Sequence, residues 1–167
     1  MGLTSFSSAA VGNVAAAQWW VRVLWVSALS TMLGAVYHGV FHVSEQNTNS
    51  AMNLWRFLLV TIHVTGFCLC RSLACLCSPS RADVIVKVAN VKLILGCAVT
   101  VFLHSEIIIP IADYSFALVM WTVLSLYKLK SNWAVMMLFG VALSIAASAV
   151  QILKMKPSES FNHNDLY

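Results

Sequence analysis

The chain has 167 residues, of which 60% are hydrophobic and only 10% are charged, and its formal net charge at pH 7 is +4. A soluble domain carries about 25% charged residues, so this composition excludes an ordinary soluble fold. The basic residues stand between hydrophobic runs rather than in one patch, which argues against nucleic acid as a partner. The composition therefore predicts the lipid bilayer as the main partner of the chain.

Apolar runs close to the ~20 residues that cross a bilayer recur along the whole sequence. We predict an all-α, polytopic membrane protein: a short tail at residues 1–17, a five-helix transmembrane bundle at 18–156 and a polar tail at 157–167. The five predicted spans cover residues 18–42, 52–70, 84–103, 110–127 and 133–153.

Charged residues indicate how the five spans are oriented. An odd number of spans places the two termini on opposite sides of the membrane. The side of the N-terminus collects most basic residues, so the positive-inside rule makes it cytoplasmic. These residues are Arg22, Arg71, Arg81, Lys87, Lys128 and Lys130. The other side collects Arg56, Lys154 and Lys156, every acidic residue except Asp83, and four of the histidines.

Those four histidines form the first candidate site. His38 and His42 are four residues apart, so they share one face of a helix. Together with nearby carboxylates, the four histidines supply enough ligands for zinc, and three ligands plus a water would form a catalytic site. The predicted metal ligands are His38, His42, His104 and His163, and the predicted base or orienting carboxylate is Asp113 or Asp165. The alternative is that polar residues simply gather where the spans leave the membrane.

Two further ionisable residues fall inside predicted spans. His63 lies near the middle of the second span, where an ionisable group marks function or is a neutral histidine bonded to a nearby Ser or Thr. Lys92 lies a third of the way along the third span. We favour a lysine that extends its amine to the cytoplasmic surface. The alternative is a pair with an acid inside the bundle, as part of an ion or proton path.

The cysteines stand at positions 68, 70, 75, 77 and 97, and two Cys-x-Cys pairs flank Arg71 on the predicted cytoplasmic side. A reducing compartment argues against disulfides. Cysteines beside a membrane and basic residues are typical of S-palmitoylation sites, and the alternative is that they have no special role.

The segments LGAVYHGVFH (33–42) and FNHNDLY (161–167) resemble a family of bacterial-type membrane proteins similar to the alkaline ceramidases and the wider superfamily of seven-helix membrane hydrolases and adiponectin-type receptors. In that superfamily a Ser, an Asp and three His surround a zinc ion that activates water to cleave a lipid amide. The resemblance implies that His38 is the early-helix ligand and that His163 precedes the last helix. Only five spans are predicted, and Gly34 and Ala35 stand where the hydrolases have Ser, so we expect a shortened relative.

Three functions follow from these patterns. The first is a metal-dependent, hydrolase-like protein that acts on a lipid amide or ester. The second is a non-enzymatic scaffold that packs through small-residue faces against itself or a membrane partner. The third is a small transporter or channel, which depends on His63 and Lys92. Whether the chain is an enzyme stays open at this point.

Overall fold

The computed structural model describes residues 3–41, 48–103 and 107–129, with isolated helical positions between 139 and 146. The described residues form helices and contain no strand. In chain order they are α1 (Leu3–Val40), α2 (Asn49–Cys75), α3 (Pro79–Ala98), the π-helical segment η2 (Val99–Leu103) and α4 (Ile108–Leu129). The prediction of an all-α fold is confirmed for this part of the chain.

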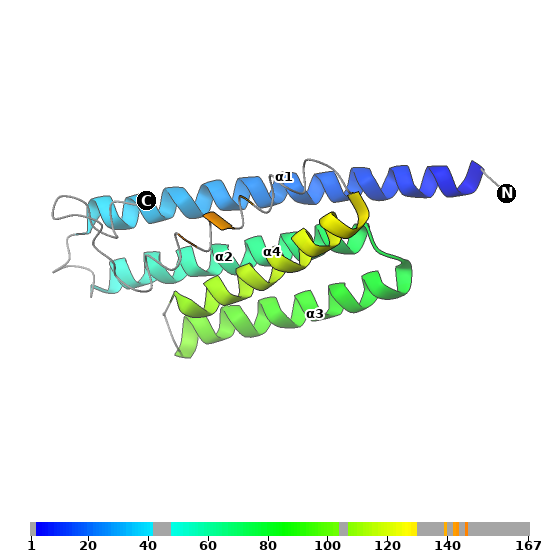
Figure 1. Cartoon of the computed structure of the whole chain (residues 1–167). Helices are drawn as coiled ribbons and strands as arrows, with labels where there is room; N and C mark the ends of the chain where they lie inside the picture. Colours follow the sequence, from blue (N-terminus) through cyan, green and yellow to red (C-terminus); the bar gives the residue numbers. More distant parts are fainter. Residues whose placement is uncertain are drawn as a thin grey trace.

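Helix α2 is the centre of the bundle. It packs along α1 and contacts both α3 and α4, whereas α3 and α4 share a much smaller contact. Successive helices run in opposite directions (Figure 1). One end of the bundle therefore holds the end of α2 and the start of α3, and the other holds the end of α1 and the start of α2.

Three helices are long and apolar enough to cross a membrane: Val14–Val40 of α1, α2, and α3 with η2. In α4 the apolar part, Ile108–Val123, is shorter. The fifth predicted span, residues 133–153, lies outside the described residues. The described part of the chain therefore contains three helices of membrane-crossing length rather than the predicted five.

Helix α1 is longer than the predicted first span. It has 38 residues, or about 57 Å of helix, which is nearly twice the ~30 Å thickness of a bilayer's hydrocarbon core. It begins at Leu3 and so extends through the segment predicted as a tail. Its first turns project beyond the other helices (Figure 1).

Local sequence signals explain where α2 and α3 begin. Thr48 is the N-cap of α2, and its side-chain oxygen accepts a hydrogen bond from the backbone N–H of Ala51 at 3.4 Å. Pro79 opens α3, where its fixed φ suits the first turn and its missing N–H costs nothing.

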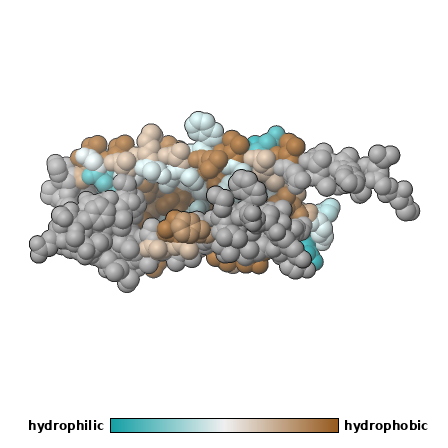
Figure 2. Space-filling view, turned by 45° about the horizontal axis from the view of Figure 1, so that its top comes forward, coloured by the Kyte–Doolittle hydropathy of each residue, from teal (hydrophilic) through white to brown (hydrophobic). Residues whose placement is uncertain are grey.

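The buried apolar residues form two clusters, one toward each end of the bundle. The larger consists of Val23, Cys68, Leu69, Leu73, Ala117 and Trp121, and the smaller of Leu33, Leu58 and Leu59. Large hydrophobic side chains also cover the outside: Trp25 is 74% exposed and Phe102 is 82% exposed. In Figure 2 hydrophobic residues cover much of the described surface, and hydrophilic residues gather toward the two ends. This surface suits contact with lipid chains.

Candidate functional site

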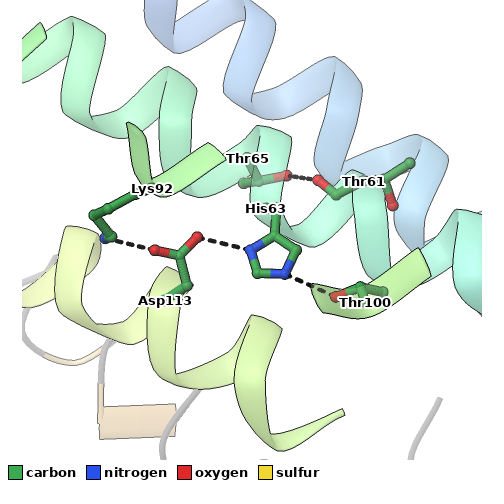
Figure 3. A network of polar contacts seen from close by, with 6 residues as sticks. All are labelled: Thr61, His63, Thr65, Lys92, Thr100 and Asp113. Atoms are coloured by element: carbon green, nitrogen blue, oxygen red, sulfur yellow. Dashed lines mark hydrogen bonds and ion pairs between the residues drawn. The ribbon is translucent and has the colours of Figure 1, made fainter. Parts of the chain in front are cut away.

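A histidine with two polar partners lies near the middle of α2. His63 is 1% exposed, so its imidazole is removed from the surroundings of the bundle. Its Nδ1 atom is 2.8 Å from Oδ2 of Asp113 on α4, and its Nε2 atom is 3.1 Å from Oγ1 of Thr100 in η2. Figure 3 shows the ring between these two partners. One imidazole thus joins three segments of the chain.

The second carboxylate oxygen of Asp113 has a partner of its own. Nζ of Lys92 on α3 is 2.5 Å from Oδ1 of Asp113, and it also lies 4.7 Å from the ring centroid of Phe116. The Asp113 side chain is 13% exposed and the Lys92 side chain 29% exposed. Lys92, Asp113, His63 and Thr100 therefore form one continuous polar chain, which we call the polar centre (Figure 3).

Two glycines lie next to this centre, and one of them allows two helices to pack closely. A Cβ atom on Gly96 of α3 would lie 2.6 Å from Cε1 and Nδ1 of His63, closer than any side chain tolerates. A Cβ atom on Gly66 of α2 would lie 3.5 Å from Cα of Tyr114 and 3.6 Å from Oδ2 of Asp113. The missing side chain of Gly96 therefore lets α3 pack on the imidazole, whereas the distances at Gly66 are ordinary van der Waals contacts that a methyl group could also make.

Helix α3 changes its winding next to the centre. Residues Val99–Leu103 are π-helical, and Thr100, which is 1% exposed, belongs to this segment. Short π-helical segments occur frequently at functional sites, because the extra residue per turn redirects side chains. Here the Thr100 hydroxyl meets His63 across the interface with α2.

The hydrogen-bonding inventory of these groups allows two protonation states. When His63 is neutral, its Nδ1–H donates to the Asp113 carboxylate, and its Nε2 accepts from the Thr100 hydroxyl. When His63 is protonated, Nε2–H donates to the same hydroxyl, since a hydroxyl oxygen also accepts. With Lys92 positive and Asp113 negative, the centre carries no net charge in the first state and one positive charge in the second. A proton can thus be added without loss of a contact.

A narrow crevice adjoins the polar centre between α2, α3 and α4. From His63 it follows successive turns of α2 toward the end of the bundle at which Arg71 lies. Its walls include Gly66, Phe67, Cys70, Ala89 and Leu93, together with Lys92 and Asp113. The crevice therefore points from the ionised pair toward one end of the bundle.

The predicted site residues fall into three groups. Asp113 belongs to the polar centre, with His63 and Lys92 as its partners. His38 lies elsewhere, near the end of α1, where its ring packs 6.5 Å from that of Trp55. Trp55 precedes His63 by eight residues, or about 12 Å of helix, so the structure does not bring His38 and Asp113 together.

The third group contains the remaining predicted ligands and base. His42, His104, His163 and Asp165 lie outside the described residues. Among the residues whose placement the structure describes, no group of three or more His, Cys, Asp or Glu side chains is arranged to hold a metal ion.

The outcomes for the two ionisable residues within spans differ. His63 does bond to a threonine, as one interpretation of the sequence predicted, but it also bonds to an acid. The favoured interpretation of Lys92, a lysine extended to the cytoplasmic surface, is wrong, because its amine pairs with Asp113 inside the bundle. The alternative, a pair with an acid in the bundle, is confirmed. Thr100 and Gly96 were not predicted as site residues. The sequence signal that could have indicated them is their spacing of four residues, which places them on one helix face.

The five cysteines are free. Cys68 is buried in the larger apolar cluster, and the other four are partly exposed. Cys70 lines the crevice beside the polar centre.

Fold and site together define the class: an α-helical protein of membrane-type composition, with an ionisable centre inside the helix bundle. Residues 3–167 match a family described as "Family of unknown function (DUF6962)". The chain belongs to this family. No curated protein and no solved structure matches the chain at a significant level.

Proposed function

We propose that this chain is a multi-pass integral membrane protein with five transmembrane helices, and that its polar centre binds and releases a proton as part of proton-coupled transport. The crevice beside the centre extends along α2 from His63 to Cys70, toward the end of the bundle that bears Arg22 and Arg71. By the positive-inside rule this end faces the cytoplasm, together with the N-terminus.

One observation carries the proposal: the continuous chain from Lys92 through Asp113 and His63 to Thr100, held by α2, α3, η2 and α4. Ionisable groups inside a membrane bundle are costly, and chains of Asp, Glu and His there are typical of proton relays in transporters. Polar contacts that only fix helices together need no more than hydroxyl or amide groups. The polar centre contains a lysine, a carboxylate and an imidazole in series, which helix association alone does not require.

The geometry also favours proton exchange over nucleophilic catalysis. Asp113, His63 and Thr100 are linked in the order of an acid, a histidine and a hydroxyl, as in hydrolase triads. However, a nucleophile must reach its substrate, and Thr100 is 1% exposed. A buried, paired chain of this kind suits a proton better than an acyl group.

The test is proton flux through the purified chain in liposomes that contain a pH-sensitive dye. With a potassium gradient and valinomycin as the driving force, wild type should acidify or alkalinise the interior faster than empty liposomes. Asp113→Asn should reduce this flux to the background. The matched control is Asp83→Asn, because Asp83 pairs with Lys87 on the exposed face of α3 and should leave the flux unchanged.

Flux in wild type equal to that of empty liposomes would contradict unaided proton conduction. A screen for solute-driven proton movement would then decide whether a co-substrate is required. If no solute produces a difference between wild type and Asp113→Asn, the transport proposal fails and a scaffold function, through contacts with a second copy or a membrane partner, is favoured.

A second candidate function is the hydrolase-like activity on a lipid amide or ester, with zinc as its cofactor. The observation that favours it is the position of His38 at the end of the bundle opposite to Arg22 and Arg71, which is the non-cytoplasmic side in the predicted topology. At the same end of the bundle, α1 ends at Val40, two residues before His42, and η2 ends at Leu103, one residue before His104.

Metal content tests this second candidate. Zinc is counted per chain for the purified protein after dialysis against a weak chelator, in wild type and in the double variant His38→Ala/His42→Ala. About one zinc per wild-type chain, lost in the double variant, would support the site and justify assays with lipid amides. Zinc that is absent from wild type, or retained by the double variant, would contradict it.

A further inference from the structure

Two arginines from neighbouring helices share one indole ring. The guanidinium carbon of Arg22 on α1 lies 4.1 Å from the ring centroid of Trp19, and that of Arg71 on α2 lies 5.0 Å from the same ring. Arg71 also lies 6.0 Å from the ring of Phe67, which packs edge-on against Trp19 at 6.0 Å. Arg22 and Arg71 therefore each lie within cation–π distance of the same indole ring, at the α1–α2 interface.

Neither arginine has a carboxylate partner within the described residues. The acidic residues described are Asp83 and Asp113, and both are paired with lysines. Two guanidinium groups on one ring repel each other unless an anion lies near them, and the ring faces compensate only part of this repulsion. The electrostatics of this pair therefore favour a bound anion.

Helix lengths place the pair at one membrane surface. Arg22 precedes the end of α1 at Val40 by 18 residues, or about 27 Å, and Arg71 follows the start of α2 at Asn49 by 22 residues, or about 33 Å. A bilayer's hydrocarbon core is about 30 Å thick. When Val40 and Asn49 lie at one surface, both arginines reach the headgroup layer of the other. Tryptophan favours the same layer.

We propose that Arg22 and Arg71 form a binding site for the phosphate group of an anionic phospholipid, with Trp19 as its base. Two planar guanidinium groups present parallel N–H donors, which match phosphate oxygens in a bidentate manner. Acyl chains of such a lipid would run along the apolar outer faces of α1, where Val21, Leu24 and Trp25 are exposed. The position in the headgroup layer favours a lipid phosphate over free phosphate.

Native mass spectrometry of the full chain tests the proposal. Wild type, released from mixed micelles with equal amounts of phosphatidylglycerol and phosphatidylcholine, should retain phosphatidylglycerol preferentially. Arg22→Gln/Arg71→Gln should lower this retention about tenfold, and each single variant should lower it less. Arg22→Lys/Arg71→Lys keeps the charge but removes the planar donors, so its retention should be intermediate.

Matched controls separate this site from general positive charge. Arg81→Gln removes an exposed arginine from the start of α3 at the same end of the bundle, and its lipid retention should equal that of wild type. Asp113→Asn should also retain the lipid, so the outcome is independent of the proposed transport. The helix content of each variant is measured by circular dichroism, to confirm that it is folded.

Three results would overturn the assignment. The first is equal retention of phosphatidylglycerol by wild type and by a folded Arg22→Gln/Arg71→Gln variant. The second is an equal loss in Arg81→Gln, which would show attraction by overall charge. The third is displacement of the lipid by an equal concentration of inorganic phosphate, which would show a site for free phosphate.

Discussion

Gly96 lies directly against the imidazole of His63: a Cβ atom on Gly96 would come within 2.6 Å of ring atoms Cε1 and Nδ1. The two residues belong to α3 and α2, so this contact sets how closely the two helices pack. Nδ1 is also the atom that bonds to Asp113. The closeness of α3 therefore fixes the position of the nitrogen that links His63 to the acid.

Gly96→Ala is expected to destabilise the bundle. The added methyl group must displace the imidazole or push α3 away, and overpacking of this kind costs about 1–3 kcal/mol. The measurement is the free energy of unfolding in mixed micelles with increasing sodium dodecyl sulfate, followed by circular dichroism. Gly39→Ala is the matched control, because a Cβ atom there meets nothing within 4 Å. Equal stability of both variants would show that His63 does not occupy this position.

Asp113→Asn is expected to weaken the bundle as well as the proposed transport. It leaves the Lys92 amine without its negative partner, and removal of one member of a buried pair costs about 3–5 kcal/mol. Because the Lys92 side chain is 29% exposed, we expect the lower part of this range. Asp83→Asn, at an exposed pair with a 2.7 Å contact, should not change the unfolding midpoint. A similar shift in both variants would contradict the buried pair.

A double-mutant cycle measures whether Lys92 and Asp113 act as a pair. Lys92→Met and Asp113→Leu are each expected to destabilise, and the double variant should lose less than the sum of the two. Residues in direct contact typically show coupling of about 0.5–3 kcal/mol. The same unfolding assay gives all four free energies. Additive effects would mean that the two groups do not interact in the folded protein.

Thr100→Val is expected to lower stability by about 1–3 kcal/mol, because it leaves Nε2 of the buried His63 without a partner while it keeps the side-chain shape. Thr100→Ser, which keeps the hydroxyl, should restore most of the loss. Thr31→Val is the control, since the Thr31 hydroxyl bonds only to a backbone oxygen of its own helix at an exposed position. Loss of stability in Thr100→Ser as large as in Thr100→Val would contradict the hydrogen bond to His63.

Hydrophobic length predicted the helices because it reflects one local property, the run of apolar residues that a bilayer requires. The predicted second span at 52–70 thus lies within α2, and the third at 84–103 ends with η2 at Leu103. The ends of helices depend on capping as well, which is why α2 begins three residues earlier, after the Thr48 cap. The extension of α1 to Leu3 has no hydrophobic signal, because its first turns are rich in Ser and Ala.

The polar centre was harder to predict because it joins residues far apart in the chain. Asp113 follows His63 by 50 residues, and no spacing rule relates them. Counting spans placed Asp113 at the membrane boundary with the histidines, whereas α4 carries it to the level of His63 beside Gly66. The prediction that Lys92 extends to the cytoplasmic surface used only its position along the span. It did not include Asp113, the partner that α4 supplies. The depth of each charged residue was thus set by packing between helices rather than by position within a span.

The protonation state of His63 in a lipid bilayer tests the central claim most directly. Solid-state nuclear magnetic resonance of ¹⁵N-histidine in the reconstituted chain resolves its ring nitrogens, and the spectrum of His63→Gln identifies the His63 signals by difference. We predict a ring that carries a proton on Nδ1 and donates it to the Asp113 carboxylate, and loss of this strong Nδ1–H hydrogen bond in Asp113→Asn. A ring whose only proton is on Nε2, or a ring whose signals are unaltered by Asp113→Asn, would contradict the account.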